Sequence, residues 1–89
     1  MAHFAQINEQ NIVTEVLVIG NQQVDDLPFP ESEPVGQAFI ASCGITGEWL
    51  QTSYNGNFRG EFAGIGDYYD ASIGEYGAFV APEPTEVTP

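Results

Sequence analysis

The chain has 89 residues and a formal net charge of −12, because 13 acidic residues stand against a single arginine and no lysine. Such a surface repels phosphate groups and cannot release counterions from nucleic acid. We therefore do not expect DNA, RNA or an anionic membrane as a partner. The length allows one small domain with a thin core.

Residues 3 to 19 are predicted to form a β-hairpin. The stretch HFAQI alternates in polarity, NEQN supplies turn residues, and IVTEVLVI is β-branched and apolar. Glu15 is the only charged residue of the second strand, so both faces of that strand are mostly apolar. We therefore expect the second strand to be covered on both sides.

The next segment, residues 21 to 34, is rich in proline and acidic residues and is predicted to be a loop. A short helix is predicted from about Pro34 to Cys43, because proline suits the first helical position and Gly44 suits the position just after the end. Five residues recur at the spacing of one helical face, which we expect to be buried. They are Val35, Ala38, Phe39, Ser42 and Cys43.

The stretch EWLQTSY, residues 48 to 54, is predicted to be a strand that ends at the Asn-Gly turn signal of NGN. Residues 58 to 66 are interrupted by glycines and predict no regular element. A second hairpin is predicted further on, with residues 68 to 71 paired with residues 78 to 81.

These elements predict a mainly β (α+β) fold, a small antiparallel sheet of hairpins with one short helix, in a single domain over residues 1 to 81. Residues 82 to 89 are expected to form an extended, proline-rich arm. The residues expected to supply much of the core are Trp49, Phe39, Val16, Val18, Phe62 and Phe79.

The sequence contains no catalytic constellation, and the protein is not expected to be an enzyme or to need a cofactor. His3 is the only histidine, and Cys43, the only cysteine, is expected to be a small buried hydrophobe. One interpretation of Asp67, Asp70 and Glu75 is a calcium site across the second hairpin. Solvated charges at a hairpin tip are the favoured interpretation, so no metal site is predicted.

The only cation lies in the glycine-rich stretch QTSYNGNFRGEFAGIG. We expect Arg59 to pair with Glu61, Asp67 or Asp70 and so to hold this segment in place, since a guanidinium can bind a carboxylate through two hydrogen bonds. The alternative is that it reaches an acidic residue of a neighbouring subunit. The candidate interface or clasp residues are Arg59, Tyr54, Phe58, Phe62, Pro82 and Pro84.

Three stretches of the chain carry a resemblance to a known family: MAHFAQINEQNIV, WLQTSYNGNFRGEFAGIGDYYD and FVAPEP. They resemble a family of small bacteriophage proteins, found especially in marine and cyanobacterial phages, with the central pattern W-x-QTSYN-x-NFR-x-x-[FY]-AGIG-x-x-YD. The match covers roughly half of the chain. Relatives commonly carry lysines around the arginine of this motif, and the present chain has none.

The resemblance implies a phage gene product without enzymatic chemistry, and small acidic β-rich phage proteins tend to bind other virion proteins. We therefore expect an accessory capsid protein of the decoration or cement class, located in the virion after assembly in the host cytoplasm. The major capsid protein is its first expected partner, and homo-oligomers are allowed. One alternative is a tail- or fibre-associated virion protein. The other is a non-virion acidic protein that binds a basic host protein.

Overall fold

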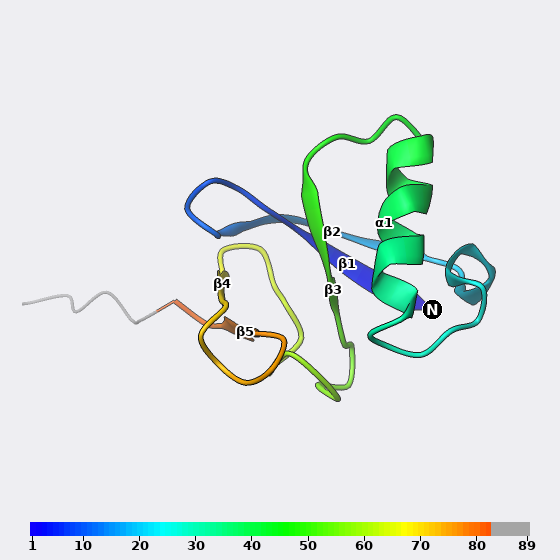
Figure 1. The fold of residues 1–89 in the computed structure, drawn as a ribbon. Helices are drawn as coiled ribbons and strands as arrows, with labels where there is room; N and C mark the ends of the chain where they lie inside the picture. Colours follow the sequence, from blue (N-terminus) through cyan, green and yellow to red (C-terminus); the bar gives the residue numbers. More distant parts are fainter. Residues whose placement is uncertain (83–89) are drawn as a thin grey trace, which may run out of the picture.

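A three-stranded antiparallel sheet forms the centre of the fold, which a computed structural model describes for residues 1–82. Its strands are β1 (Ala2–Ile7), β2 (Val13–Ile19) and β3 (Glu48–Thr52), in the order β2-β1-β3 (Figure 1). The predicted hairpin over residues 3 to 19 and the predicted strand over residues 48 to 54 are confirmed, although β3 ends at Thr52.

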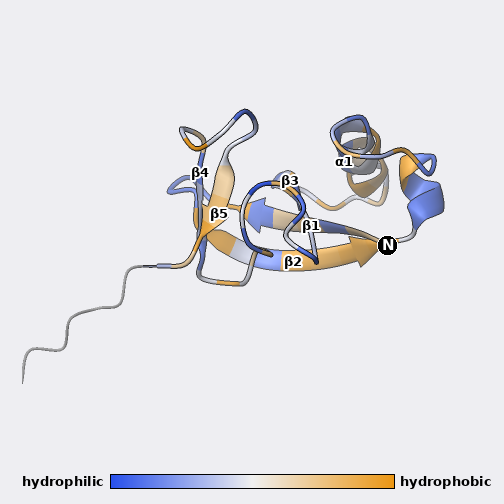
Figure 2. Ribbon diagram, turned by 90° about the horizontal axis from the view of Figure 1, so that it is seen from below, coloured by the Kyte–Doolittle hydropathy of each residue, from blue (hydrophilic) through white to orange (hydrophobic). Residues whose placement is uncertain are grey.

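Four further elements surround this sheet. They are the 3-10 helix η1 (Asn21–Val24), the helix α1 (Ser32–Ser42) and the paired strands β4 (Tyr68–Asp70) and β5 (Ala78–Val80). Figures 1 and 2 show α1 near the end of the sheet where the chain begins and the β4–β5 pair near the other end. The mainly β fold, the short helix and the second hairpin are thus confirmed, and η1 lies in a segment that was predicted to be a loop.

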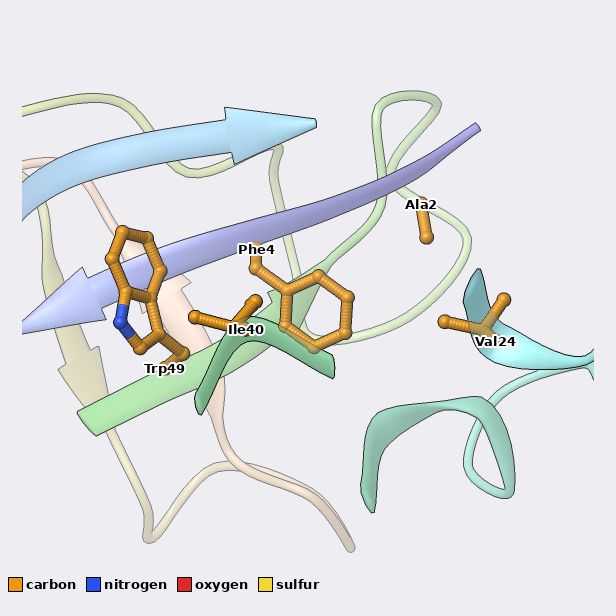
Figure 3. Close-up of a cluster of buried hydrophobic side chains, with 5 residues drawn as sticks. All are labelled: Ala2, Phe4, Val24, Ile40 and Trp49. Atoms are coloured by element: carbon orange, nitrogen blue, oxygen red, sulfur yellow. The ribbon is translucent and has the colours of Figure 1, made fainter. Parts of the chain in front are cut away.

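Alternation along β1 divides the core into two clusters, because successive side chains of a strand point to opposite faces. Phe4 points towards α1, whereas Ala5 points to the other face; neither is exposed. The cluster under α1 contains Ala2, Phe4, Val24, Ile40 and Trp49 (Figure 3). The cluster on the opposite face contains Ala5, Ile7, Val13, Ala63 and Phe79.

The strand that is covered on both faces is therefore β1, and the prediction of two covered faces for β2 is wrong. β3 pairs with the free side of β1, so β1 becomes the central strand and β2 remains at the edge of the sheet. Within β2, Val13 is buried, but Val18 keeps 46% of its surface exposed.

The predicted buried face of the helix is also wrong. α1 begins at Ser32 rather than Pro34, and it buries Ser32, Gly36 and Ile40. A Cβ on Gly36 would lie 2.6 Å from Cε1 of Phe4, so the missing side chain lets the helix approach the sheet closely. On the predicted face, Val35 and Phe39 are half-buried, and Ala38, Ser42 and Cys43 are exposed.

The predicted core is partly right. Trp49 and Phe79 are buried, Val16 and Phe39 are half-buried, and Val18 and Phe62 are exposed. Val18 is exposed because it lies on the edge strand. The prediction of a buried Cys43 is wrong because this residue follows the last turn of α1 at the surface.

Candidate functional site

The guanidinium of Arg59 is buried and joins three parts of the chain, with only 9% of the residue exposed. Nη1 and Nη2 donate to the two carboxylate oxygens of Glu33, in the first turn of α1, with 3.1 Å between Nη2 and Oε1. Nη1 also donates to the carbonyl of Gln51 in β3 at 3.1 Å, and Nε donates to the carbonyl of Tyr76 at 3.0 Å. One side chain thus links α1, β3 and the segment before β5.

The predicted type of pair is present, but its partner is not one of the three residues expected. Glu33 lies far from Arg59 in the sequence, and the packing of α1 beside β3 brings the two together. Asp67 instead accepts a hydrogen bond from the Gly64 N–H at 2.8 Å. Asp70 accepts from the hydroxyl and the N–H of Ser72, which lowers the pKa of the Asp70 carboxyl below its ordinary value.

Aromatic rings cover the guanidinium. Its Cζ lies 5.1 Å from the ring centroid of Phe29 and 5.6 Å from that of Tyr69, within the range of cation–π attraction. Phe29 in turn stacks on Phe58 with 3.9 Å between ring centroids. Phe58, a candidate interface residue, is therefore half-buried, with its ring stacked on the ring that covers the guanidinium.

These contacts close the outer edge of β3. An edge strand presents unpaired backbone groups to which another strand can bind. Here the N–H of Gln51 donates to Oε2 of Glu33 at 2.8 Å, and the carbonyl of Gln51 accepts from Arg59. Nε2 of Gln37, one turn further along α1, donates to the carbonyl of Trp49 at 2.6 Å. Side chains thus occupy positions that an added strand would need.

The outer edge of β2 has no such cover. At its start, Val13 donates to the carbonyl of Asp67 at 2.7 Å and accepts from the N–H of Gly66 at 2.9 Å. Beyond Val13, no backbone group among residues 1–82 bonds to the outer side of the strand.

The pairing register shows which groups of β2 point outward. In an antiparallel ladder each residue directs its N–H and C=O to one neighbouring strand only. Gln51 directs these groups away from Phe4, its partner in β1, so Phe4 directs its own towards Leu17 in β2. The alternate residues of β2, Val16 and Val18, therefore direct their N–H and C=O groups away from the sheet.

A groove lies beside this open edge on the face that α1 covers. It has a volume of about 550 Å³ and lies between β2 and the loop that follows α1. Glu15 and Leu17 line it on the β2 side, and Ile45, 42% exposed, lines it on the loop side. Glu15 is the only charged residue of β2.

On the other face of the sheet, three rings form an exposed aromatic patch made of His3, Tyr54 and Phe62. The ring centroids lie 5.2–5.5 Å apart, and Tyr54 is 66% exposed. Burial, and to a lesser extent the charge of the N-terminus, lower the pKa of His3 below its ordinary value. Val18 is the cross-strand partner of His3, so its side chain lies on the same face as the patch.

The structure thus separates the candidate residues into different places. Arg59 is buried and Phe58 is half-buried near it, whereas Tyr54 and Phe62 come together at the surface. Pro82 is exposed, and Pro84 with the rest of the predicted arm lies outside the described residues. Sequence reasoning missed Glu33, Gln37 and the open edge of β2, because these follow from the order of the strands rather than from a local motif.

Within residues 1–82, no three His, Cys, Asp or Glu side chains come together as a metal site. None of the helices in this part of the chain is long and apolar enough to cross a bilayer. No protein-family model, curated protein or solved structure matches the chain. Function is therefore inferred from the aromatic patch and from the two edges of the sheet.

Proposed function

We propose that this protein is an accessory structural protein of a bacteriophage virion, of the decoration or cement class, which binds the major capsid protein. The observation that carries the proposal is the exposed aromatic patch, in which Tyr54 is 66% exposed and Phe62 is 36% exposed. Aromatic residues at the surface supply much of the binding energy of protein interfaces.

The patch is well placed for binding because it lies on the sheet. His3 belongs to the central strand β1, and the rings of Tyr54 and Phe62 both pack against its imidazole. Rings held in this way lose little conformational freedom when a partner covers them, so less of the interaction energy is lost to ordering. This favours a role in binding another protein.

Two further features indicate the kind of partner. The formal charge of −12 favours a partner surface with basic residues around the contact, since opposite charges speed encounter and set orientation. Tyr54 and Phe62 also lie within the central motif by which the chain resembles small phage proteins. Together these features support a virion protein as the partner.

Quantitative mass spectrometry of purified particles from the encoding phage tests this proposal. A decoration protein is expected in many copies, comparable with the number of major capsid subunits. A few copies per particle would favour a tail- or fibre-associated protein instead. Absence from the particles would contradict a virion role and favour the non-virion alternative.

A Tyr54→Ala variant tests the patch itself. It should bind particles at least about tenfold more weakly, because an interface aromatic can contribute 2 kcal/mol or more. Its melting temperature should hardly change, since Tyr54 is mostly exposed. Ile73→Ala, at an exposed position in the segment between β4 and β5, is the matched control and should bind normally.

A further inference from the structure

We propose that the outer edge of β2 binds an extended segment of the partner protein as an added β-strand, and that this segment alternates apolar residues with lysine or arginine. The inference deepens the proposed function and rests on it in one respect, namely that the segment belongs to another virion protein. The binding mode itself follows from the edge of this sheet.

The backbone of β2 supplies the hydrogen bonds. Val16 and Val18 direct two N–H and two C=O groups outward, and no backbone group among residues 1–82 takes them up. An extended segment beside them can satisfy all four groups, as in other complexes formed by strand addition. The β2 segment also contains no proline or lysine, two residues by which edge strands commonly resist such pairing.

The side chains of β2 indicate what the added strand must present. On the face that carries the aromatic patch, Val16 and Val18 offer apolar surface, with Val18 46% exposed. On the opposite face, Glu15 and Leu17 border the groove that Ile45 closes on its far side. Apolar side chains suit the first face, and a cation suits the second, opposite Glu15.

Charge argues against a second copy of this chain as the occupant. Each copy carries a formal charge of −12, so two copies repel each other. The only arginine or lysine side chain, that of Arg59, is buried against Glu33 and cannot reach a Glu15 of another copy. A strand with lysine or arginine at alternate positions removes the repulsion and pairs with Glu15.

The other edge of the sheet provides an internal control. At β3, Glu33, Arg59 and Gln37 already occupy backbone groups of Gln51 and Trp49. A segment that adds to the sheet should therefore bind β2 and leave β3 unaffected.

The test uses the full chain and a blocked peptide of alternating valine and lysine, with amide hydrogen exchange measured by NMR. At saturating peptide, exchange at Val16 and Val18 should slow by about tenfold or more. Exchange at Gln51 should stay the same. No protection at β2, or protection spread evenly over the molecule, would overturn the inference.

Two peptide controls separate the backbone contribution from that of charge. N-methylation of alternate residues on the pairing side of the peptide should abolish protection, whereas N-methylation on the other side should not. A peptide of alternating valine and glutamate should bind at least about tenfold more weakly at low salt. Equal binding of the valine–lysine and valine–glutamate peptides would overturn the proposal that the partner segment carries lysine or arginine.

Variants of the protein give a second test. Val18→Pro removes one outward N–H but no N–H of the β1–β2 ladder, so the protein should fold and bind the peptide at least about fivefold more weakly. Val18→Thr keeps the N–H and should bind like the native protein. Glu15→Gln should weaken binding by about two- to fivefold at low salt. A folded Val18→Pro variant with native affinity would contradict the proposal.

The outcomes also distinguish this inference from the proposed function. A protein that binds the peptide at β2 but is absent from phage particles would contradict the virion role and support strand addition. A protein that is abundant in particles but shows no protection of β2 would support the virion role and contradict strand addition. Self-association through β2, seen as protection that rises with protein concentration without peptide, would overturn the inference in favour of a second copy.

Discussion

The two edges of the central sheet differ in how their backbone groups are used. At β3, the side chains of Glu33, Gln37 and Arg59 bond to three outward backbone groups of the strand. At β2, the outward groups of Val16 and Val18 face away from the described fold. One sheet therefore has a closed edge and an open edge, and only the open edge is available to another chain.

This difference gives the single cation of the chain a clear structural role. A guanidinium has five N–H donors in one plane, so Arg59 can bind both oxygens of Glu33 and still reach the carbonyls of Gln51 and Tyr76. A lysine ammonium could not match this planar arrangement. The arginine therefore serves the closed edge, and the remaining acidic residues leave the surface negative.

Loss of the arginine should have the largest effect on the closed edge. Arg59→Ala should lower the free energy of unfolding by about 2–4 kcal/mol, because it leaves the half-buried Glu33 carboxylate without its counter-charge and the carbonyl of Gln51 without its donor. Urea denaturation followed by circular dichroism measures the change. Backbone strain does not bias this comparison, since the native arginine and the introduced alanine must both adopt the positive φ of 56° found at this position.

A matched double variant separates the ion pair from the packing around it. Replacing Glu33 and Arg59 together by methionine should recover much of the lost stability, since no buried charge is then left without a partner. A native-like Arg59→Ala protein would contradict the role of this pair in closing the edge.

The closed edge also depends on how near α1 lies to the sheet. Gly36→Ala should lower the free energy of unfolding by about 1–3 kcal/mol, because the new methyl group overlaps the ring of Phe4. In an exposed helix the same change would stabilise by about 1 kcal/mol. Differential scanning calorimetry gives the sign of the change in melting temperature. A higher melting temperature would rule out the close approach of α1 to the sheet. Adding Phe4→Leu should restore part of the loss.

A smaller effect is expected at the second hydrogen bond to the β3 edge. Gln37→Leu removes the donor to the carbonyl of Trp49 and should lower the free energy of unfolding by about 1 kcal/mol. Gln22→Leu, at an exposed position of η1, is the control and should stay within about 0.5 kcal/mol of the native protein. Equal effects of the two changes in urea denaturation would show that the bond does not stabilise the edge.

The smallest effect concerns His3, the cross-strand partner of Val18 in the central strand β1. Its pKa is lowered in the fold, so between that pKa and the ordinary value of 6.5 the unfolded chain binds more protons than the folded one. The free energy of unfolding should therefore fall as pH drops through 6.5 and level off below the folded pKa. The difference between native protein and His3→Gln, measured by denaturation from about pH 7.5 to 5, isolates this contribution. A difference that is constant over this range would contradict the lowered pKa.

Local pattern was sufficient to predict the strands and the helix α1, but not the 3-10 helix η1. The alternating polarity and the turn residues within residues 3 to 19 give the first hairpin, and the Asn-Gly signal gives the turn that follows β3. Gly44 follows α1 with the expected positive φ of 80°. These features depend on neighbours in the chain, which is why they can be predicted from it.

The arrangement of the elements could not be predicted in the same way. β2 is more apolar than β1, yet β1 is the central strand because β3 pairs with it. The helix contacts the sheet through Gly36, and a search for large apolar residues overlooks such a position. The carboxylate that binds Arg59 was sought nearby, but Glu33 reaches it only because α1 packs beside β3.

The most direct measurement is amide hydrogen exchange of the free protein, resolved by residue with NMR. A closed β3 edge and an open β2 edge predict that the amide of Gln51 exchanges at least about a hundredfold more slowly than the amides of Val16 and Val18. Slow exchange at Val16 and Val18, equal to that at Gln51, would show that the β2 edge is already occupied and would contradict the difference between the two edges.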